Sequence, residues 1–375
     1  MLYCRKCGNV VKADARFCEK CFSRLDKDGV SSAVNEYEIA AMSRNSEEFS
    51  ADSYVTKSNL CGERVFGYRL TRLMGSVAES DYYTASSAAE GVVINKTVRH
   101  IVFPDRESLD CLRLVNGFSD KKAMQTLEKC IKAVPQGISD FIGLCGKAGL
   151  NCAYEDSAVY RSELMGTYHV FVLMKPVIPL WQYIRGKKIT LREVIGWGIS
   201  MVSQLEAAEQ YGLKYICISD TDIFFDDTGN VFVGSGVQDT FSDNMYLGAY
   251  STARNIYKIP FGMDADPSVY SAGMLIYLLL NGMRHPYINY SSGQITRSGY
   301  LTAEKLRAEH APAQMPRFAR NSLGKVLLRT FSDVDEHRVS AAELNRVLKN
   351  SLIYISTEEL NTVVLDIEDY GEKQC

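Results

Sequence analysis

The hydrophobic pattern changes once along this chain, and that change limits the possible folds more than any other feature. Three alternating segments with turn residues between them, at 68–74, 81–86 and 91–101, predict consecutive strands. Apolar residues then recur at helical spacing over 191–205, and Gly212 follows where a left-handed C-cap is expected. This order predicts an α+β protein with a small β-rich lobe before a larger helical lobe.

The helical part carries three further signals. Ile223–Phe225 and Val231–Val233 flank the sequence DDTGN, which is typical of a β-hairpin turn. The apolar run at 273–280 is about half as long as a membrane span and predicts a buried helix. Ser340 and Glu343 have the spacing of a capping box that opens the last helix. We therefore expect one hairpin among buried and capped helices.

Bulk composition describes a soluble globular protein. The 375 residues exceed one ordinary core, so two or more domains are expected. The net charge of −3 gives no reason to propose a nucleic-acid partner for the whole chain. The start has no signal-peptide pattern and no membrane segment is expected, so the chain is interpreted as cytoplasmic. In that compartment the scattered cysteines are expected to be reduced.

Four cysteines near the start have metal-ligand spacing. Cys4 and Cys7 form one CxxC pair, and Cys18 and Cys21 form a second after ten intervening residues. Two such pairs complete a tetrahedral four-thiolate site for Zn²⁺. About 25 residues cannot bury enough surface to fold unaided, so the metal supplies the folding free energy. We expect a structural zinc ribbon at 1–25 and a flexible Ser-, Asn- and Glu-rich linker at 26–62.

The predicted ribbon is locally basic, and this leaves two interpretations open. Asp14 and Glu19 are its only acidic residues. One interpretation is nucleic-acid contact, and the other, which we favour, is a solvated surface without aromatic residues available for base stacking. The basic residues are Arg5, Lys6, Lys12, Arg16, Lys20 and Arg24.

The region at about 65–350 resembles the bacterial serine/threonine protein kinase family, in the subset with an N-terminal zinc ribbon. SVYSAGMLIYLLLNGMRHPY (268–287) is similar to the central buried helix and following loop. IFFDDTGNVFVGSG (223–236) resembles the strands between catalytic loop and metal-binding motif, and DVDEHRVSAAEL (333–344) the opening of the last helix. The resemblance implies a bilobal kinase-like domain at 63–352. The remaining residues, 353–375, either add a strand or form a partly ordered tail.

In this family a glycine-rich loop covers the phosphates of ATP. The motif GxGxxGxVY falls on residues 75–83, where only Gly75 keeps a glycine. Val77 and Ser80 replace the other two, and Tyr82 stands at the valine position. Their side chains lie where backbone amides should approach phosphate, so the resemblance implies impaired phosphate binding.

The remaining nucleotide positions have their own candidates. The lysine that holds the phosphates falls on either Lys96 or Arg99, and its partner on a helix is either Glu128 or Asp140. An arginine keeps the charge but does not replace a lysine freely. The resemblance also implies that Met174 is the gatekeeper and that Lys175 and Val177 would face an adenine if one binds.

The catalytic loop departs furthest from the family. HRDxKPxN falls on 215–222, so the proton-accepting aspartate becomes Cys217, the lysine becomes Ser219 and the asparagine becomes Asp222. The metal-binding DFG becomes Gly234 followed by serine and glycine, and no carboxylate remains to hold Mg²⁺. Ser268 stands where the central helix usually carries an aspartate.

Asp222 could still hold a divalent ion together with nearby carboxylates. Asp220, Asp226 and Asp227 lie close in sequence. We favour the alternative in which Asp226 and Asp227 are turn residues and Asp220 is solvated.

Together these departures predict a pseudokinase with a structural zinc ribbon, used as a regulatory or protein-binding element. Whether ATP and Mg²⁺ bind is left open. One alternative is an active, atypical serine/threonine kinase that uses substitute residues such as Cys217 or Asp222. A second alternative is a nucleic-acid-binding zinc-ribbon protein whose large domain is a scaffold.

Overall fold

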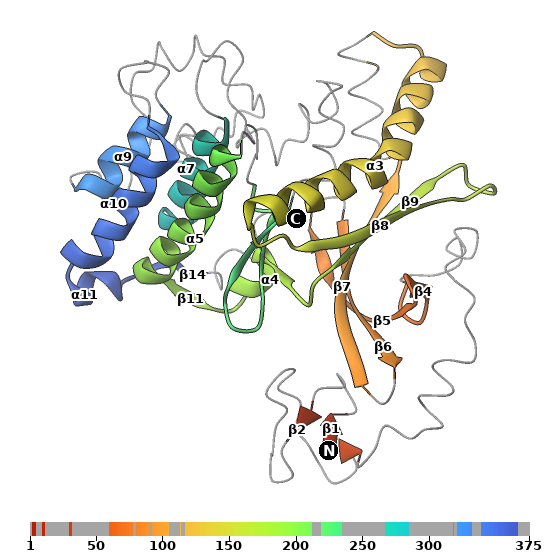
Figure 1. Cartoon of the computed structure of the whole chain (residues 1–375), viewed down its shortest axis with the longest axis horizontal. Coiled ribbons are helices and arrows are strands. Elements are labelled where there is room, and N and C mark those ends of the chain that lie inside the picture. Colours follow the sequence, from red (N-terminus) through yellow and green to blue (C-terminus); the bar gives the residue numbers. More distant parts are fainter. Residues whose placement is uncertain are drawn as a thin grey trace. The chain divides into compact units, whose positions relative to one another are not determined.

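Figure 1 shows a computed structural model of the whole chain, which divides into two compact units. The β unit comprises Met1–Phe103 and Glu155–Val177, and the helical unit comprises Pro104–Tyr154 and Ile178–Cys375. The structure describes residues 60–77, 80–89, 92–104, 113, 117–211, 219–234, 267–284, 318, 321–331 and 339–366. Near the start it describes only the backbone of three short strands, at 2–4, 10–11 and 30–31.

These short strands form a sheet of their own. β1 (Leu2–Cys4) pairs with both β2 (Val10–Val11) and β3 (Val30–Ser31). β3 falls inside the segment that the sequence predicts as a linker. Of the four predicted zinc ligands, Cys4 lies in β1, and Cys7, Cys18 and Cys21 lie outside the described residues. The zinc site therefore stays a prediction.

The main part of the β unit is a six-stranded sheet with the order β4-β5-β6-β7-β9-β8. Its strands β5, β6 and β7 are antiparallel neighbours in the chain and in the sheet, which confirms the three strands expected from alternation. Each is longer than the sequence pattern predicted. The bounds are β4 (Arg64–Val65), β5 (Tyr68–Val77), β6 (Ser80–Ala89), β7 (Val92–Phe103), β8 (Tyr154–Arg161) and β9 (Tyr168–Met174).

The two faces of this sheet have different partners. Tyr83, Val98 and Leu173 lie opposite one another on β6, β7 and β9, and they pack with Leu60 and Val65 in one apolar cluster. We call this side the Val98 face. Because side chains alternate along a strand, the neighbouring residue of β7 points to the other side. That side is called the Arg99 face.

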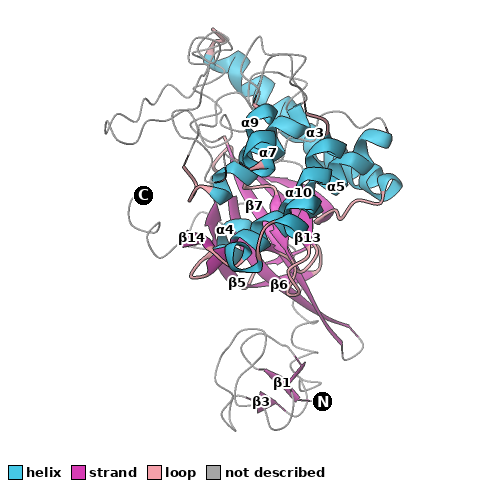
Figure 2. Cartoon of the chain, turned by 90° about the vertical axis from the view of Figure 1, so that its left-hand side faces the viewer, coloured by secondary structure: helices cyan, strands magenta, loops and turns pink. Residues whose placement is uncertain are grey.

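The helical unit contains a bundle of α5, α7, α9 and α10, in which α5 contacts α7 and α10, and α9 contacts the same two helices (Figure 2). α7 is buried on every side from Ser268 to Leu280, which confirms the buried helix predicted at 273–280. The helices are α3 (Asp120–Ala148), α4 (Leu180–Ile184), α5 (Leu191–Gln210), α7 (Pro267–Leu280), α9 (Ser322–Thr330), α10 (Ala341–Tyr354) and α11 (Thr357–Leu360).

Caps define the ends of these helices. Ser340 accepts a hydrogen bond from the backbone N–H of Glu343 at 3.1 Å, so the predicted N-terminus of α10 is confirmed. Thr190 and Glu193 form a full capping box at the start of α5, which the sequence reading missed. α5 ends at Gln210 with Tyr211 as its C-cap, and Gly212 lies outside the described residues.

Short strands complete the helical unit. β12 (Ile223–Phe225) and β13 (Val231–Val233) form the predicted hairpin, and β10 (Ile178–Pro179) pairs with β12. β14 (Val363–Asp366) pairs with β11 (Lys188–Thr190), so the C-terminal segment adds a strand. None of the helices among the described residues is long and apolar enough to cross a membrane.

Candidate functional site

Lys96 and Arg99, the two candidates for the phosphate-binding cation, lie on opposite faces of the sheet. Lys96 is on the Val98 face, and its Nζ forms an ion pair with Oε2 of Glu155 at 2.5 Å. Arg99 is opposite Tyr82 on one side and Val172 on the other. Met174, the predicted gatekeeper, is opposite Thr97 and so shares the Arg99 face. Arg99 is therefore the candidate that lies on the same face as the gatekeeper.

The Arg99 side chain is buried against the segment that the resemblance aligns with the phosphate loop. It is 2% exposed, and its Nε donates a hydrogen bond to Oγ of Ser80 at 2.9 Å. The guanidinium carbon lies 5.8 Å from the centroid of the Tyr82 ring, within the range of a cation–π contact. A buried cation is costly unless such contacts replace its hydration. Ser80 and Tyr82 supply them here.

The phosphate-loop segment itself is a β-hairpin. Gly75 pairs with Tyr82 and Val77 pairs with Ser80, so the ladder between β5 and β6 continues to the tip. Ser76 Oγ donates to Oδ1 of Asp81 at 2.5 Å across the same ladder. The described part of this segment is therefore paired strand as far as Val77 and Ser80.

The segment after β9 is held by two internal hydrogen bonds. The backbone N–H of Val177 donates to the carbonyl of Lys175 at 2.7 Å. The Oγ1 of Thr97 donates to the carbonyl of Val177 at 2.6 Å. Met174 and Val177 are both buried. The carbonyls of Lys175 and Val177 and the N–H of Val177 therefore already have partners within the β unit.

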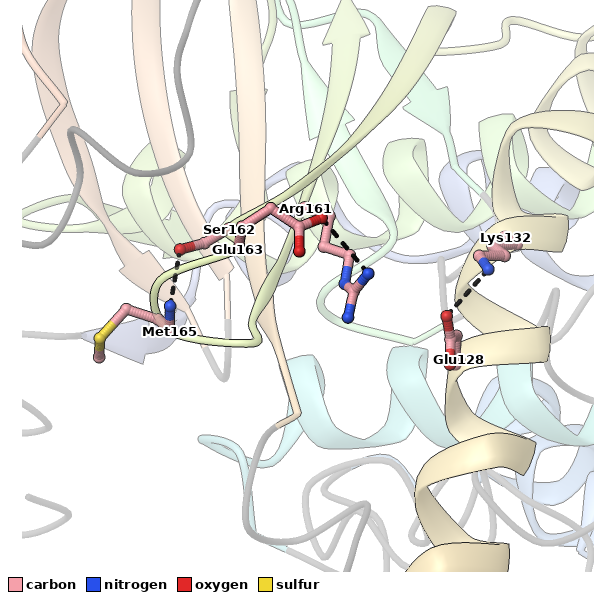
Figure 3. Close-up of polar contacts among 6 residues, drawn as sticks. All are labelled: Glu128, Lys132, Arg161, Ser162, Glu163 and Met165. Atoms are coloured by element: carbon pink, nitrogen blue, oxygen red, sulfur yellow. Dashed lines mark hydrogen bonds and ion pairs between the residues drawn. The ribbon is translucent and has the colours of Figure 1, made fainter.

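Both candidate helix carboxylates lie on α3. Glu128 forms an ion pair with Lys132 at 2.9 Å (Figure 3), and Oδ1 of Asp140 accepts a hydrogen bond from Gln136 at 2.8 Å. These are contacts one helical turn apart on the same helix. These contacts do not distinguish Glu128 from Asp140 as the partner of a phosphate-binding cation.

Figure 3 also shows the turn that joins β8 to β9. Ser162 Oγ accepts a hydrogen bond from the N–H of Met165 at 3.1 Å, and Arg161 pairs with Glu163 at 3.3 Å. Leu164 and Met165 are exposed there. The turn is thus ordered by its own polar contacts.

The catalytic-loop positions within the described residues form a buried polar cluster. Ser219 Oγ donates to Oδ2 of Asp222 at 2.5 Å and is 2.8 Å from Oγ1 of Thr221. Asp222 is 1% exposed, and its carbonyl accepts a hydrogen bond from the N–H of Gly234 at 2.8 Å. Cys217 lies outside the described residues. Ser219 and Asp222 are therefore hydrogen-bonded to each other, and Asp222 is also hydrogen-bonded to the backbone of Gly234.

Asp220 is also held by a neighbour. The Nε1 of Trp181, on α4, donates to its Oδ2 at 2.6 Å. Asp220 is buried, so the expectation that it is solvated is wrong. Ser268, at the position of the expected brace on α7, is buried too, and its carbonyl accepts a hydrogen bond from Ser271 at 3.0 Å.

Gly234, at the position of the metal-binding aspartate, has no room for any side chain. Val233 exchanges backbone hydrogen bonds with Asn151 and Ala153, both at 2.9 Å, and this pairing brings Tyr154 beside Gly234. A Cβ atom on Gly234 would lie 2.6 Å from Oη of Tyr154 and 2.9 Å from Cε2 of Phe224. Both rings are buried. The space of the carboxylate that the kinase resemblance places here is thus occupied by other side chains.

The turn between β12 and β13 accounts for Asp226. Its Oδ1 accepts hydrogen bonds from the N–H groups of Thr228 and Asn230, both at 2.9 Å. Burial alone would raise the pKa of Asp226, but the hydrogen bonds from Asn230 and Thr228 hold it below its usual value. This agrees with the turn interpretation. Among the residues that the structure describes, no three His, Cys, Asp or Glu side chains are grouped so as to hold a metal ion.

Two features of the site were missed by the sequence reading. Thr97 was not singled out, although its hydroxyl reaches the carbonyl of Val177. Tyr82 was aligned with the valine of the loop motif, but its contact with Arg99 was not foreseen. Tyr82 could have been found from the sequence, because a tyrosine stands there at the valine position of the loop motif.

Comparisons with protein-family models and with curated proteins give no match. Among solved structures, the chain is similar to a point mutant of the kinase domain of Mycobacterium tuberculosis PknI, with a TM-score of 0.45 and 14% sequence identity. The match covers 79% of this chain and all of the other. A likeness of this degree carries no argument about function, which has to rest on the contacts described above.

Proposed function

We propose that this chain is a pseudokinase: a bilobal kinase-like module, preceded by a zinc ribbon, that acts as a regulatory or protein-binding element. The order of elements supports a kinase-like fold. Three antiparallel strands, β5 to β7, are followed by the long helix α3, then by β8 and β9, and then by a helical bundle that contains the hairpin β12–β13. This is the order that the sequence resemblance implies.

The observation that carries the proposal is the environment of Gly234. In a kinase, an aspartate at this position holds the Mg²⁺ that neutralises the phosphates. Here Tyr154 and Phe224 occupy the volume that even a methyl group would need. An aspartate could therefore not be restored without moving two buried rings. Without this ligand the largest electrostatic contribution to phosphoryl transfer is missing.

The second support is the state of Asp222. This residue takes the position of the asparagine that would bind a second Mg²⁺, and one of its carboxylate oxygens accepts the Ser219 hydroxyl hydrogen. Ser219 in turn replaces the lysine of the catalytic loop. A positioned base alone is worth about 10²–10⁴ in rate, and here the base and the metal ligand are both replaced. Two separate losses favour a binding role over catalysis.

Phosphate transfer tests this proposal. The full-length chain is incubated with γ-labelled ATP, a protein substrate such as casein, and either Mg²⁺ or Mn²⁺. We expect the incorporated label to equal that of the Asp222→Ala variant, because no intact metal site remains. Incorporation by the wild-type chain that is lost in Asp222→Ala would contradict the proposal and favour the active-kinase alternative.

We also propose that Cys4, Cys7, Cys18 and Cys21 hold a structural zinc ion. The support is their spacing, since two CxxC pairs are the usual donor set of a zinc ribbon. The purified chain is expected to contain zinc, and Cys7→Ser should lower the zinc content by at least half. Cys61→Ser, at an exposed cysteine outside the ribbon, is the matched control and should leave the content unchanged.

A further inference from the structure

Three groups of the β unit would meet a nucleotide in a kinase: the phosphate loop, the phosphate-binding cation and the segment after β9. In this chain each of them contacts another of these groups or β7. All of these contacts lie on the Arg99 face of one sheet. They can therefore be examined without reference to the helical unit.

The cation, Arg99, contacts two residues of the segment that the resemblance aligns with the phosphate loop. Ser80 stands at a glycine position of the loop motif, and its hydroxyl oxygen accepts a hydrogen bond from Nε of Arg99 at 2.9 Å. Tyr82, at the valine position, places its ring under the guanidinium. Charge-assisted hydrogen bonds and cation–π contacts are strong inside a protein because water does not compete. A phosphate would compete with these contacts for the guanidinium group.

The segment that would recognise adenine is closed by hydrogen bonds of its own. An adenine needs a carbonyl to accept from its amino group and an N–H to donate to its ring nitrogen. Here the N–H of Val177 and the carbonyl of Lys175 bond to each other at 2.7 Å. Thr97 Oγ1 then donates a hydrogen bond to the carbonyl of Val177. The N–H of Val177 could bond to a base only if its bond to the carbonyl of Lys175 were broken.

The volume on this face is filled as well. Tyr82 is fully buried, as are Val172 and Met174 on β9. A tyrosine ring is planar and aromatic, and it is several carbon atoms larger than the valine side chain of the motif. The ring of Tyr82 therefore supplies, from within the chain, an aromatic surface of the kind that a base would bring.

We propose that the β unit fills its own nucleotide site, with Tyr82, Ser80 and Arg99 in place of the nucleotide and Thr97 closing the segment that would bind its base. The inference rests on the proposed function, because it uses the kinase-like positions of these residues. It goes further in one respect: the nucleotide-binding positions of the β unit are permanently filled by its own side chains, and the interactions of the chain with partners do not depend on ATP or ADP.

Calorimetric titration of the full-length chain with adenosine and with ATP tests this directly. No Mg²⁺ or Mn²⁺ is added, so that no divalent ion bridges ATP to the chain. We expect no binding of either compound by the wild-type chain up to about 1 mM. Binding of adenosine by the wild-type chain below this concentration would overturn the proposal, and this arm needs no variant to fold.

The Tyr82→Val/Thr97→Ala double variant tests the mechanism. It restores the valine of the motif and removes the hydroxyl that fixes the segment at Val177. We expect it to bind adenosine at least tenfold more tightly than the wild-type chain. Tyr83→Val is the matched control, since Tyr83 is equally buried but lies on the Val98 face. Equal gains in both variants, or no gain in a folded double variant, would contradict the proposal.

A hydrogen-exchange measurement covers the case in which the double variant does not fold. The amide of Val177 should be protected in the wild-type chain and unchanged by 1 mM ATP. The phosphate-transfer assay separates the two proposals. Nucleotide binding without transfer would overturn only the closed site, whereas transfer would overturn the pseudokinase proposal as well.

Discussion

On the Arg99 face of the β unit and in the Ser219–Gly234 segment of the helical unit, the positions that the kinase resemblance assigns to nucleotide and metal are filled by internal contacts, but in different ways. On the Arg99 face the obstacles are side-chain atoms beyond Cβ, on Tyr82, Ser80 and Thr97. At Gly234 the obstacle begins at Cβ itself, because atoms of two buried rings lie within 3 Å of the position that a Cβ would take. Shortening the side chains can therefore open the Arg99 face. At Gly234, room for a side chain would require that the rings of Tyr154 and Phe224 move.

The largest effect is expected from Gly234→Asp. The new Cβ would overlap with Tyr154 and Phe224, and the carboxylate would be buried without hydration. We expect a loss of about 3 kcal/mol or more in the free energy of unfolding, measured by urea titration, and no gain in phosphate transfer. Gly234→Ala should lose about 1–3 kcal/mol.

Two controls accompany this variant. Tyr154→Phe removes the hydroxyl that would lie 2.6 Å from the new Cβ, so it should recover part of the loss in Gly234→Ala. Gly143→Ala, on α3, meets no atom within 4 Å and should be neutral or slightly stabilising. If Gly234→Asp had the stability of the wild-type chain, the difference between the two regions would disappear.

Trp181→Phe probes the support of the catalytic-loop segment. The variant keeps a ring in α4 but removes the Nε1–H that Asp220 accepts at 2.6 Å. Hydrogen bonds to a charged group contribute about 1.5–3 kcal/mol, so a loss of about 2 kcal/mol is expected. Urea titration measures it, with Asp220→Asn in the same background to show whether the charge matters. A loss below about 0.5 kcal/mol would mean that this segment is not held from α4.

The Val98 face should make the β unit sensitive to acid. His100 is buried, with Nε2 3.0 Å from Nδ1 of His169, and its ring stacks on Phe171. Asp81 is the ionisable residue directly opposite it on β6. Burial, with a smaller contribution from His169, lowers the pKa of His100 to about 3. The folded chain therefore stays neutral at this residue while the unfolded chain takes up a proton below about pH 6.5.

The sign of the effect follows from this difference. Stability is full above pH 6.5 and is lost as the pH falls toward 3, by about 2 kcal/mol at pH 5. Urea midpoints at pH 7 and pH 5 measure the loss. His100→Phe should remove most of it, since a phenyl ring keeps the stack without titrating. An unchanged pH dependence in this variant would show that other groups are responsible.

The smallest effect is expected from Asp222→Asn, which restores the residue of the kinase motif. The amide oxygen can still accept the Ser219 hydroxyl hydrogen, so the free energy of unfolding should change by less than about 1 kcal/mol. Phosphate transfer should stay at background, because the space at Gly234 is still filled. Phosphate transfer by this variant would mean that the negative charge of Asp222 alone prevents catalysis in the wild-type chain.

The parts of the fold that were predictable are those set by nearby residues. Alternation predicted β5 to β7, and the turn sequence DDTGN predicted the hairpin of β12 and β13. The 29-residue helix α3 was not predicted as one element, since it continues through Pro135, a residue that disfavours helix interiors. Packing along the amphipathic helix outweighs that local preference.

The candidate site depended on contacts that are distant in sequence. Counting along the chain left Lys96 and Arg99 as alternatives, because strand register and facing depend on β6 and β9. The loss of the aspartate at Gly234 was readable directly. The occupation of its space was not, because Tyr154 lies on a separate segment that reaches Gly234 through pairing with Val233.

Thermal unfolding of the full-length chain with and without ATP, each in Mg²⁺ and in EDTA, tests the central claim most directly. A ligand at a hundred times its dissociation constant stabilises a protein by about 2.7 kcal/mol, which is several degrees in Tm for a domain of this size. We predict no shift at millimolar ATP in either condition. A shift that requires Mg²⁺ would show that a carboxylate still anchors Mg·ATP, and it would contradict the account.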